Sequence, residues 1–512
     1  MHSPRSEHFD ILIIGAGLSG VGAGVHLGKH CPGKSYVILE NRDAIGGTWD
    51  LFRYPGIRSD SDMFTLGYAF KPWTERKAIA DGPSIWKYVN DTAREYGVDR
   101  HIRFKHKVTR ASWDSQSQRW TIEAEHEEAP KRFTADFLLS CAGYYNYDSG
   151  YTPEFKGAES FKGRVVHPQH WPKDLDYAGK RVVVIGSGAT AVTLVPAMAD
   201  KARHVTMLQR SPTYMISMPA EDKLANGLRR FLPAQFAYDI TRLMRTVLQQ
   251  LFFHLARTRP AKTRERLLKL VEEQIGAEEV ARHFTPRYNP WEQRLCLVPD
   301  NDMFLAIKAG KASVVTDTIE AFSEKGLKLA SGAVLRADVI VTATGLALQM
   351  FGGVEIVVDG AKIESGDLTI YRGAMFTGVP NFFSVFGYTN ASWTLKADLI
   401  SEYACRVINY MDEYGLAQVT PGAPGEEALE RSFVDFSSGY FQRVAHLLPK
   451  QTDTAPWKLN QNYGHDIMAL RFGPVEDGVL RFAKRRDLFP PRAGEGRRAL
   501  SSPLAVGASH SA

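Results

Sequence analysis

Residues 9–20 read Phe9-Asp-Ile-Leu-Ile-Ile-Gly15-Ala-Gly17-Leu-Ser-Gly20. The run before Gly15 is almost entirely apolar, which is typical of a strand buried on both faces of a parallel sheet. The glycines have Gly-x-Gly-x-x-Gly spacing, and a helical pattern continues from them to Leu27. A second apolar run, Tyr36-Val-Ile-Leu39, ends in Glu40. Strand, glycines, helix and acid in this order predict a βαβ unit that binds a dinucleotide.

Each residue of this motif has an expected role. Gly15 should make the tight turn, Gly17 should let the backbone approach a pyrophosphate, and Gly20 should let helix and strand pack closely. The first turn of the helix offers N–H groups without intrahelical partners to the phosphates. Glu40 is expected to accept hydrogen bonds from an adenosine ribose.

A second unit of the same kind begins at Arg181-Val-Val-Val-Ile185 and continues into Gly186-Ser187-Gly188-Ala189-Thr190-Ala191. Ala191 stands at the third glycine position, where alanine is accepted. The next strand, Val205-Thr-Met-Leu208, is followed by Gln209, Arg210 and Ser211 instead of an acid. An arginine without an acid accommodates a 2′-phosphate, so this unit is predicted to bind NADPH.

The fold class follows from the pairing of these units. The strings 135–143 and 337–345 both start with Ala-Asp and reach a glycine at the same spacing. We interpret them as equivalent return strands of two similar units. The predicted fold is therefore α/β, with two Rossmann-like dinucleotide-binding domains and a helical insertion.

Two longer motifs stand beside the glycine-rich turns. One is Phe-x-Gly-x-x-x-His-x-x-x-Trp-Pro, filled by Phe161, Gly163, His167, Trp171 and Pro172. The other begins at Gly46-Gly47-Thr48-Trp49 and continues through Tyr54-Pro55-Gly56 to Asp60. Together they resemble the fingerprints of the type I Baeyer–Villiger monooxygenases, a branch of the class B flavin monooxygenases. Taken alone, residues 161–172 would indicate only a loop shaped by glycine and proline.

The resemblance implies FAD on the first unit, NADPH on the second, and O2 as co-substrate. A ketone would become an ester or lactone through a flavin C4a-peroxide, and sulfides and thioamides would also be oxidised. Gly47, Thr48 and Trp49 would lie along the flavin. Arg294 would stabilise the peroxide and Asp60 would hold its guanidinium. The motif containing His167 and Trp171 would couple the movements of the two domains.

One position departs from the family pattern. Many members carry Lys-Arg where this chain has Gln293-Arg294. In those members the lysine helps to hold the NADPH 2′-phosphate. Selectivity for NADPH in this chain is therefore expected to depend more on Arg210.

The resemblance also sets the expected domain boundaries. The FAD-binding domain should comprise residues 1–145 and 346–489, and the NADPH-binding domain residues 146–215 and 291–345. Residues 216–290 should form the helical insertion, and residues 490–512 a disordered tail.

The insertion contains apolar residues at helical spacing: Ile240, Leu243, Met244, Val247, Leu248, Leu251, Phe252 and Leu255. This pattern predicts an amphipathic helix, with Arg242 and Arg245 on its other face. A basic run follows it. We interpret the region as a helical subdomain packed beside the cofactor domains, with peripheral attachment to an anionic membrane as the alternative. Nucleic-acid binding is not expected, because the basic run has no interleaved aromatic residues.

Composition supports a cytoplasmic enzyme. The chain has 512 residues, is 44% hydrophobic and 23% charged, and has a formal net charge of +6. Its four cysteines lie far apart in sequence, which predicts buried thiols in a reducing compartment and neither a zinc site nor a redox disulfide. The first ten residues are polar and lack a signal-peptide pattern.

Three other functions share parts of the pattern. An N- or S-oxygenating flavin monooxygenase shares everything except the Trp171-Pro172 ending and the Asp60 segment. A pyridine-nucleotide disulfide reductase needs a cysteine pair, which the sequence lacks. A non-catalytic flavoprotein would have no reason to keep a second nucleotide site together with Asp60 and Arg294.

Overall fold

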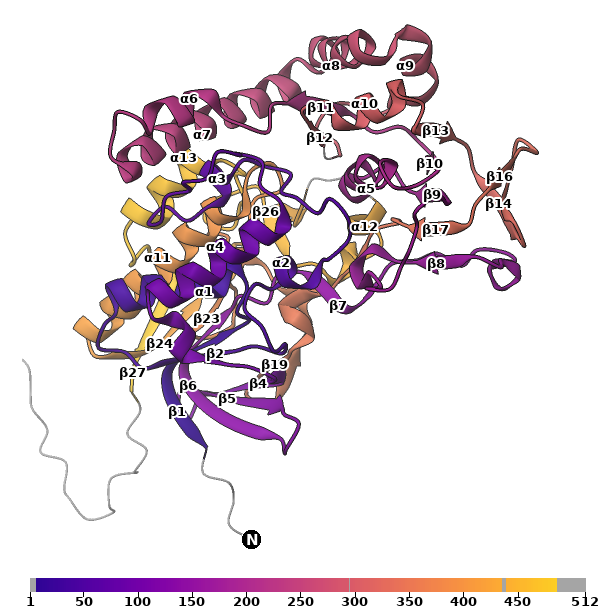
Figure 1. Cartoon of the computed structure of the whole chain (residues 1–512). Coiled ribbons are helices and arrows are strands. Elements are labelled where there is room, and N and C mark those ends of the chain that lie inside the picture. Colours follow the sequence, from indigo (N-terminus) through magenta and orange to yellow (C-terminus); the bar gives the residue numbers. More distant parts are fainter. Residues whose placement is uncertain (1–5, 294, 435–438, 486–512) are drawn as a thin grey trace, which may run out of the picture.

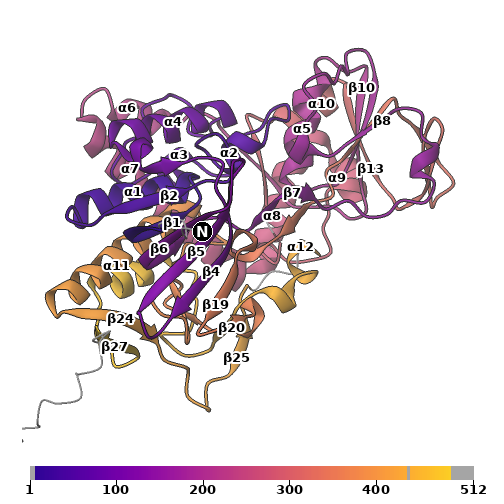
Figure 2. The same ribbon diagram turned by 90° about the horizontal axis from the view of Figure 1, so that it is seen from below.

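The computed structural model describes residues 6–293, 295–434 and 439–485. Within them, two separate sheets organise two lobes that lie side by side (Figures 1 and 2). The larger sheet contains nine strands: β1 Glu7–Ile14, β2 Tyr36–Leu39, β3 Ile102–Arg103, β4 Lys107–Asp114, β5 Arg119–Glu125, β6 Lys131–Ser140, β19 Glu355–Val358, β20 Ala361–Ile363 and β23 Phe382–Ser384. Their order is β20-β19-β4-β5-β6-β1-β2-β3, and β23 lies beside β6.

The first glycine-rich motif follows the central strand of this sheet. β1 runs parallel to both β2 and β6, with Ile14 opposite Leu39 and Ser140. The four apolar residues that end β1 are buried, as expected for a strand covered on both faces. This confirms the predicted strand–turn–helix unit.

The smaller sheet is entirely parallel and has the order β13-β10-β9-β17-β8. Its strands are β8 Arg164–Val166, β9 Arg181–Ile185, β10 His204–Gln209, β13 Ala312–Thr316 and β17 Val339–Thr342. The pairing of β17 with β9 repeats that of β6 with β1. The predicted equivalence of the two return strands is thus confirmed.

Helices cover the sheets and form most of the segment between β10 and β13. The longer helices are α1 Leu18–His30, α4 Gly82–Glu95, α5 Ala189–Ala199, α7 Ala234–Thr258, α8 Pro260–Ile275 and α11 Trp393–Glu413. The shorter ones are α2 Thr48–Leu51, α3 Met63–Leu66, α6 Lys223–Leu228, α9 Ala277–His283, α10 Asp302–Lys308, α12 Gly439–Gln442 and α13 Tyr463–Asp466. α1 packs against α11 beside the larger sheet (Figure 1).

Two short strands connect the lobes. β7 (Tyr145–Gly150) takes the chain from the larger sheet to the smaller one, and β18 (Leu346–Leu348) brings it back. They pair antiparallel, with Leu346 opposite Gly150. The remaining strands make small local sheets: β11 Met215–Met218 with β12 Cys296–Pro299, β14 Ile319–Ser323 with β15 Gly326–Leu329 and β16 Val334–Arg336, β21 Ile370–Tyr371 with β22 Met375–Phe376, β24 Leu416–Pro421 with β27 Leu480–Lys484, and β25 Glu430–Ser432 with β26 Lys450–Thr452.

The predicted amphipathic helix is α7. Its polar side, and not its apolar side, packs against the protein. The side with Tyr238, Thr241 and Arg242 is buried, and α7 contacts α3 of the larger lobe. The exposed side, which we call the apolar face of α7, consists of Ile240, Leu243, Val247, Leu248, Leu251 and Leu255. Polar contacts, described below, are what hold the helix in this orientation.

All four cysteines are buried, as predicted. Among the described residues, no helix combines the length and apolar character needed to cross a membrane. The predicted tail from residue 490 lies outside the described residues.

Candidate active site

A cleft of about 420 Å³ lies at the carboxyl ends of β1, β2 and β6. In open α/β sheets, ligands bind at this edge. Both lobes line the cleft, and the helical segment contributes Gln249 of α7. Among the residues predicted to hold cofactors, the cleft is lined by Gly15, Gly17, Glu40, Gly47, Thr48, Trp49, Asp60, Ala189 and Thr190.

The first glycine motif has the geometry that its spacing predicts. Gly15 has a φ of +97°, and a Cβ there would lie 2.9 Å from the carbonyl oxygen of Cys141. A Cβ on Gly20 would lie 1.9 Å from the Gly15 carbonyl oxygen. Gly17 faces Gly47 across the turn. Larger residues would therefore break the turn or separate α1 from β1.

Glu40 is buried beside this turn. Its carboxylate accepts hydrogen bonds from the backbone N–H groups of Ala16 (2.6 Å) and Arg42 (2.9 Å). Burial raises the pKa of the Glu40 carboxyl, although these two N–H groups oppose the effect. The backbone thus orients the carboxylate at the cleft wall, where it retains accepting capacity for a ligand hydroxyl.

The second glycine motif repeats this geometry. Gly186 has a φ of +134°, and a Cβ there would lie 2.3 Å from the Ala343 carbonyl oxygen. Ser187 donates a hydrogen bond from its hydroxyl to the Ser211 carbonyl (3.1 Å). Gly188 and Ala189 are exposed at the N-terminus of α5, and Ala191 is fully buried at the helix-packing position. Arg210 and Ser211 are exposed just after β10.

The segment 46–60 lies between the two lobes. Thr190 of α5 is a polar neighbour of the buried Tyr54 hydroxyl, and a Cβ on Gly56 would lie 2.5 Å from the Ala197 Cβ. Arg58 forms an ion pair with Asp302 of α10. Asp60 follows these contacts and lines the cleft. The chain that was predicted to lie along a flavin is therefore anchored on the second lobe as well.

Three cleft residues were missed by the sequence analysis. Gln249 Oε1, Trp291 Nε1 and Asn390 Oδ1 are buried polar atoms with no hydrogen-bond partner among the described residues. Buried polar groups rarely stay unpaired, so these atoms indicate a ligand site. No periodicity or motif singles them out.

Residues 457–463 support this wall of the cleft. The Gln461 backbone carbonyl accepts a hydrogen bond from Asn390 Nδ2 (2.8 Å), and Gln461 Oε1 accepts one from the Thr389 N–H (3.2 Å). Thr389, Asn390 and the following residues up to Trp393 line the cleft at the start of α11. Gln461 therefore positions the loop that leads into this helix.

Comparison with known proteins identifies the family. The flavin-binding monooxygenase-like family matches residues 78–373, and the NAD(P)-binding Rossmann-like domain family matches residues 13–76. The chain belongs to the flavin-binding monooxygenase-like family. This confirms the expectation of a flavin monooxygenase with an α/β, dinucleotide-binding architecture.

Relatives of the chain extend over nearly its whole length. It is 53% identical to the FAD-containing monooxygenase EthA of Mycolicibacterium smegmatis over 94% of this chain and 98% of the relative. It is 54% identical to EthA of Mycobacterium tuberculosis over 94% of this chain and 99% of the relative. The fold is similar to that of an oxidised steroid monooxygenase bound to NADP, with a TM-score of 0.74 at 22% identity, covering 93% and 100% of the two chains.

Within this flavin-binding monooxygenase, His167 lies away from the cleft and beside the connecting strands. Its Nδ1 accepts a hydrogen bond from the Gln169 N–H (3.2 Å), so Nε2 carries the proton and donates to the Gly345 carbonyl (3.1 Å). Burial lowers the pKa of His167, which favours this neutral form. The ring also lies against Gly150, where a Cβ would be 1.9 Å from His167 Cε1. His167 therefore touches the chain where it enters and where it leaves the smaller lobe.

The other residues of the 161–172 motif pack within the smaller lobe. Phe161 is buried and stacks edge-on against Phe322, with ring centroids 6.3 Å apart. Gly163 passes so close to Asp338 that a Cβ would lie 2.3 Å from its carbonyl oxygen. Trp171 is half-buried against the core of this lobe, and the Pro172 carbonyl accepts from the Leu175 N–H. Of the predicted catalytic pair, Asp60 lines the cleft and Arg294 lies outside the described residues.

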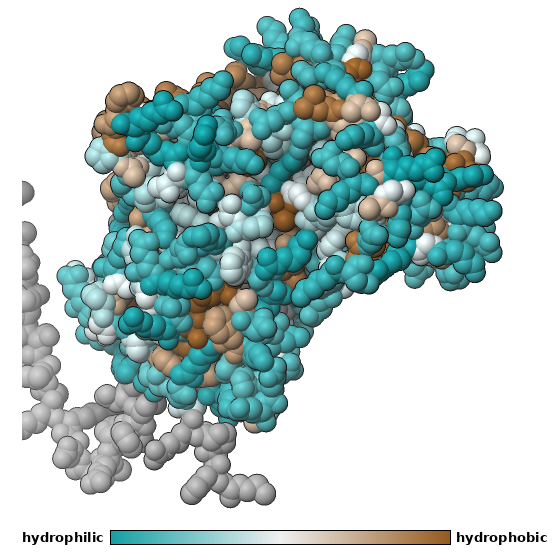
Figure 3. Space-filling view, viewed as in Figure 1, coloured by the Kyte–Doolittle hydropathy of each residue, from teal (hydrophilic) through white to brown (hydrophobic). Residues whose placement is uncertain are grey.

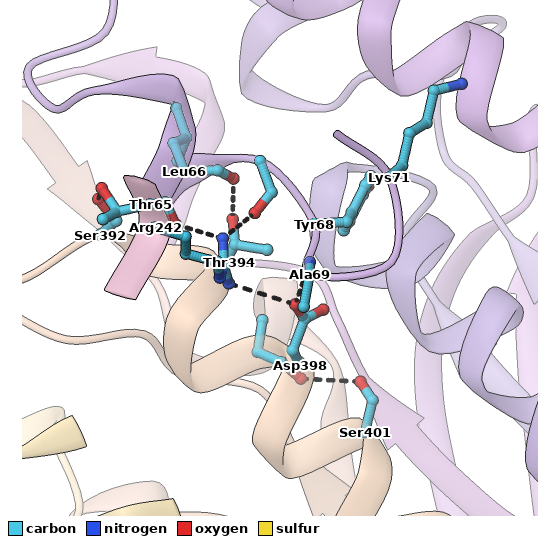
Figure 4. A network of polar contacts seen from close by, with 12 residues as sticks. Thr65, Leu66, Tyr68, Ala69, Lys71, Arg242, Ser392, Thr394, Asp398 and Ser401 are labelled. Atoms are coloured by element: carbon cyan, nitrogen blue, oxygen red, sulfur yellow. Dashed lines mark hydrogen bonds and ion pairs between the residues drawn. The ribbon is translucent and has the colours of Figure 1, made fainter. Parts of the chain in front are cut away.

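A buried polar network joins α7 to the larger lobe (Figure 4). Arg242 donates hydrogen bonds to the carbonyl oxygens of Phe64 (2.8 Å) and Gly67 (2.7 Å), and lies 3.6 Å from the Asp398 carboxylate on α11. Asp398 also accepts from the Ala69 N–H (3.0 Å). The guanidinium thus holds α3 and the loop after it, just beyond Asp60, against α11.

Proposed function

We propose that the protein is an FAD- and NADPH-dependent Baeyer–Villiger monooxygenase. It would insert one oxygen atom from O2 beside a ketone carbonyl to give an ester or lactone, and would also oxidise sulfides and thioamides. The main support is that a single cleft is lined by the first glycine-rich motif, by the segment 46–60 and by Ala189 and Thr190, which follow the glycines of the second motif. The relatives named FAD-containing monooxygenases support the flavin.

The residues of the first lobe fit FAD. Gly15 and Gly17 line the cleft before the N-terminus of α1 without side chains of their own, and Glu40 lies beside this turn for the ribose. The start of α11 lines the same cleft and has no acidic residue in its first turn. The positive end of its dipole would therefore stabilise negative charge on the flavin ring.

The residues of the second lobe fit NADPH. Gly188 and Ala189 leave the N-terminus of α5 accessible to a pyrophosphate. Arg210 and Ser211 stand where a 2′-phosphate would be recognised. The paired cofactors supply the hydride and the activation of O2, and the protein supplies binding, orientation and electrostatics.

Arg210→Gln is expected to raise the KM for NADPH about 10- to 100-fold and to leave the KM for NADH nearly unchanged, because a charged hydrogen bond to the 2′-phosphate is lost. Steady-state oxidation of both cofactors measures this. Arg203→Gln is the matched control, since Arg203 is exposed at the start of the same strand. An equal change in the KM for NADPH and for NADH would show that Arg210 does not recognise the 2′-phosphate.

Asp60 and Arg294 are the proposed catalytic pair. An arginine at the cleft would stabilise the negative charge that develops on oxygen during attack at the ketone carbonyl. Asp60 would hold the guanidinium in a fixed orientation by a charged hydrogen bond. Trp49 and the loop ending at Trp393 would restrict water around the reacting atoms.

His167 and the 161–172 motif are proposed to couple the two lobes. The ring contacts Gly150 at the end of β7 and Gly345 just before β18. A shift of the smaller lobe relative to the larger one must pass through these strands. The domain boundaries given by the sequence, which place residues 146–215 and 291–345 in the NADPH-binding domain, are part of this proposal.

The proposed setting is the cytoplasm, with peripheral attachment to an anionic membrane. Buried cysteines far apart in sequence are typical of proteins in a reducing compartment. The chain would act on small molecules and O2, and nucleic acid is not proposed as a partner.

Anaerobic reduction followed by product analysis tests the proposed function. The purified protein should bind FAD, be reduced by NADPH without O2, and convert a cyclic ketone to a lactone once O2 is admitted. Oxidation of sulfides with no lactone from any cyclic or linear ketone would instead indicate an N- or S-oxygenating enzyme. A protein that takes up no flavin would contradict both assignments.

A further inference from the structure

The most unusual surface of the molecule is the apolar face of α7. Leu243 is 66% exposed, and Phe231, in the loop before the helix, is 87% exposed. Hydrophobic side chains gather along the upper left margin of the molecule, where Figure 1 places α6 and α7 (Figure 3). Exposed apolar patches of this extent mark surfaces that bind a partner or a membrane.

The orientation of α7 is held firmly, so its apolar side cannot turn inward. Arg242 and Tyr238 are buried on the inner side and bonded to the larger lobe, and Arg245 forms an ion pair with the buried Asp222. Turning the helix would carry both arginines outward and leave the buried Asp398 and Asp222 carboxylates without these partners. The exposed apolar face is therefore a property of the folded protein.

The positive charge around α7 indicates that the partner of its apolar face is anionic. Residues 223–270 contain eleven Lys or Arg and two Asp or Glu. Arg242 and Arg245 are paired on the inner side of α7, which leaves nine other cations in this segment. Exposed cations lie at both ends of α7: Lys223 and Arg230 before it, Arg257 in its last turn, and Arg259, Lys262 and Arg266 after it. A helix with an apolar face and flanking cations is typical of proteins that lie in the interface of an anionic bilayer.

We propose that the apolar face of α7 docks on a lipid bilayer that contains anionic phospholipids. The leucine and valine side chains would enter the boundary between headgroups and acyl chains, and the flanking cations would contact phosphate groups. A second copy of the chain is the other obvious occupant. A two-fold contact would bring the same basic surface against itself, so like charges would oppose it.

The docking face lies on the element that also borders the cleft. Gln249 of α7 lines the cleft, and Phe253 packs edge-on against Trp291, another lining residue, with ring centroids 5.6 Å apart. The two faces of one helix therefore separate the proposed lipid surface from the cleft. The docking itself does not depend on the proposed reaction.

Co-sedimentation of the full-length protein with vesicles tests the proposal. The protein should bind vesicles of phosphatidylcholine mixed with phosphatidylglycerol, and bind those of phosphatidylcholine alone much less. Raising NaCl from about 0.1 M to about 0.5 M should weaken the binding, because exposed charges are then screened. Equal binding to both kinds of vesicle, or to neither, would overturn the proposal.

Leu243→Glu/Val247→Glu should lower the vesicle-bound fraction at least about tenfold, because it places two charges on the inserted face. Leu305→Glu/Val334→Glu is the matched control, since both residues are exposed and lie in the smaller lobe. Thermal unfolding checks that both variants fold. Equal loss of binding in the control would contradict the proposal. A second outcome would also contradict it: sedimentation analysis shows that the protein is a dimer, the α7 substitutions dissociate this dimer while the control substitutions do not, and the dimer binds no vesicles.

Discussion

Arg294→Ala is expected to lower the rate of oxygen transfer to a ketone about 10²- to 10³-fold, while NADPH oxidation continues. The reason is that hydride transfer and oxygen transfer depend on different residues in the proposed reaction. Hydride transfer depends on holding the two cofactors together, which is the task of the two glycine motifs. Attack on a carbonyl builds negative charge on oxygen, and losing one preorganised donor at such a site has an effect of this size.

Measuring NADPH consumption and ester or lactone yield in parallel separates the two steps. The variant should consume NADPH and release reduced oxygen species without product. Asp60→Asn should give a smaller loss, because the guanidinium would remain but be less well oriented. Arg287→Ala is the control, since Arg287 is an exposed arginine a few residues earlier. A normal ester or lactone yield from Arg294→Ala would contradict the proposed catalytic role of Arg294.

Arg242→Met is expected to lower the free energy of unfolding by about 3–5 kcal/mol, because it removes the guanidinium beside the buried Asp398 carboxylate, which His26 also contacts. Arg242 and Asp398 are 7% and 3% exposed, respectively. The change also removes the donors to the Phe64 and Gly67 carbonyls. Buried acceptors left unsatisfied add to the loss.

Chemical denaturation of the variant, monitored by circular dichroism, measures this effect. Arg266→Met is the control, because Arg266 is exposed on α8 and such changes stay within about 0.5 kcal/mol. Arg242→Met/Asp398→Leu should recover part of the stability, since no lone charge then remains buried. If Arg242→Met were as stable as the control, the network would not be what holds α7 in place.

Local features of the fold could be predicted from the sequence because their cause is local. Gly15 and Gly186 follow apolar runs and precede helical patterns, and the turn they make needs a positive φ next to a neighbouring carbonyl. Glu40 follows its strand at the spacing of a βαβ unit. Each of these requirements involves residues close together in the chain, or a pairing that the motif itself implies.

The rest of the site could not be predicted in this way. Gln249 and Asn390 reach the cleft from elements distant in sequence, and no pattern around them differs from ordinary helix or loop. The anchoring of Asn390 by Gln461 joins residues 71 positions apart. Such contacts arise only when separate elements pack, and a single sequence carries no local signal for them.

By itself, the sequence determined the two glycine-rich turns, the strands before them and the amphipathic character of residues 234–258. Only the tertiary structure decided which side of α7 is buried. Helical periodicity defines two faces but does not say which one meets the protein. That choice depends on the carbonyl groups of residues 64–67 and the carboxylate of Asp398, which satisfy Arg242 in the folded chain. Without these partners a buried arginine would be unstable, and with them the apolar side is left facing outward.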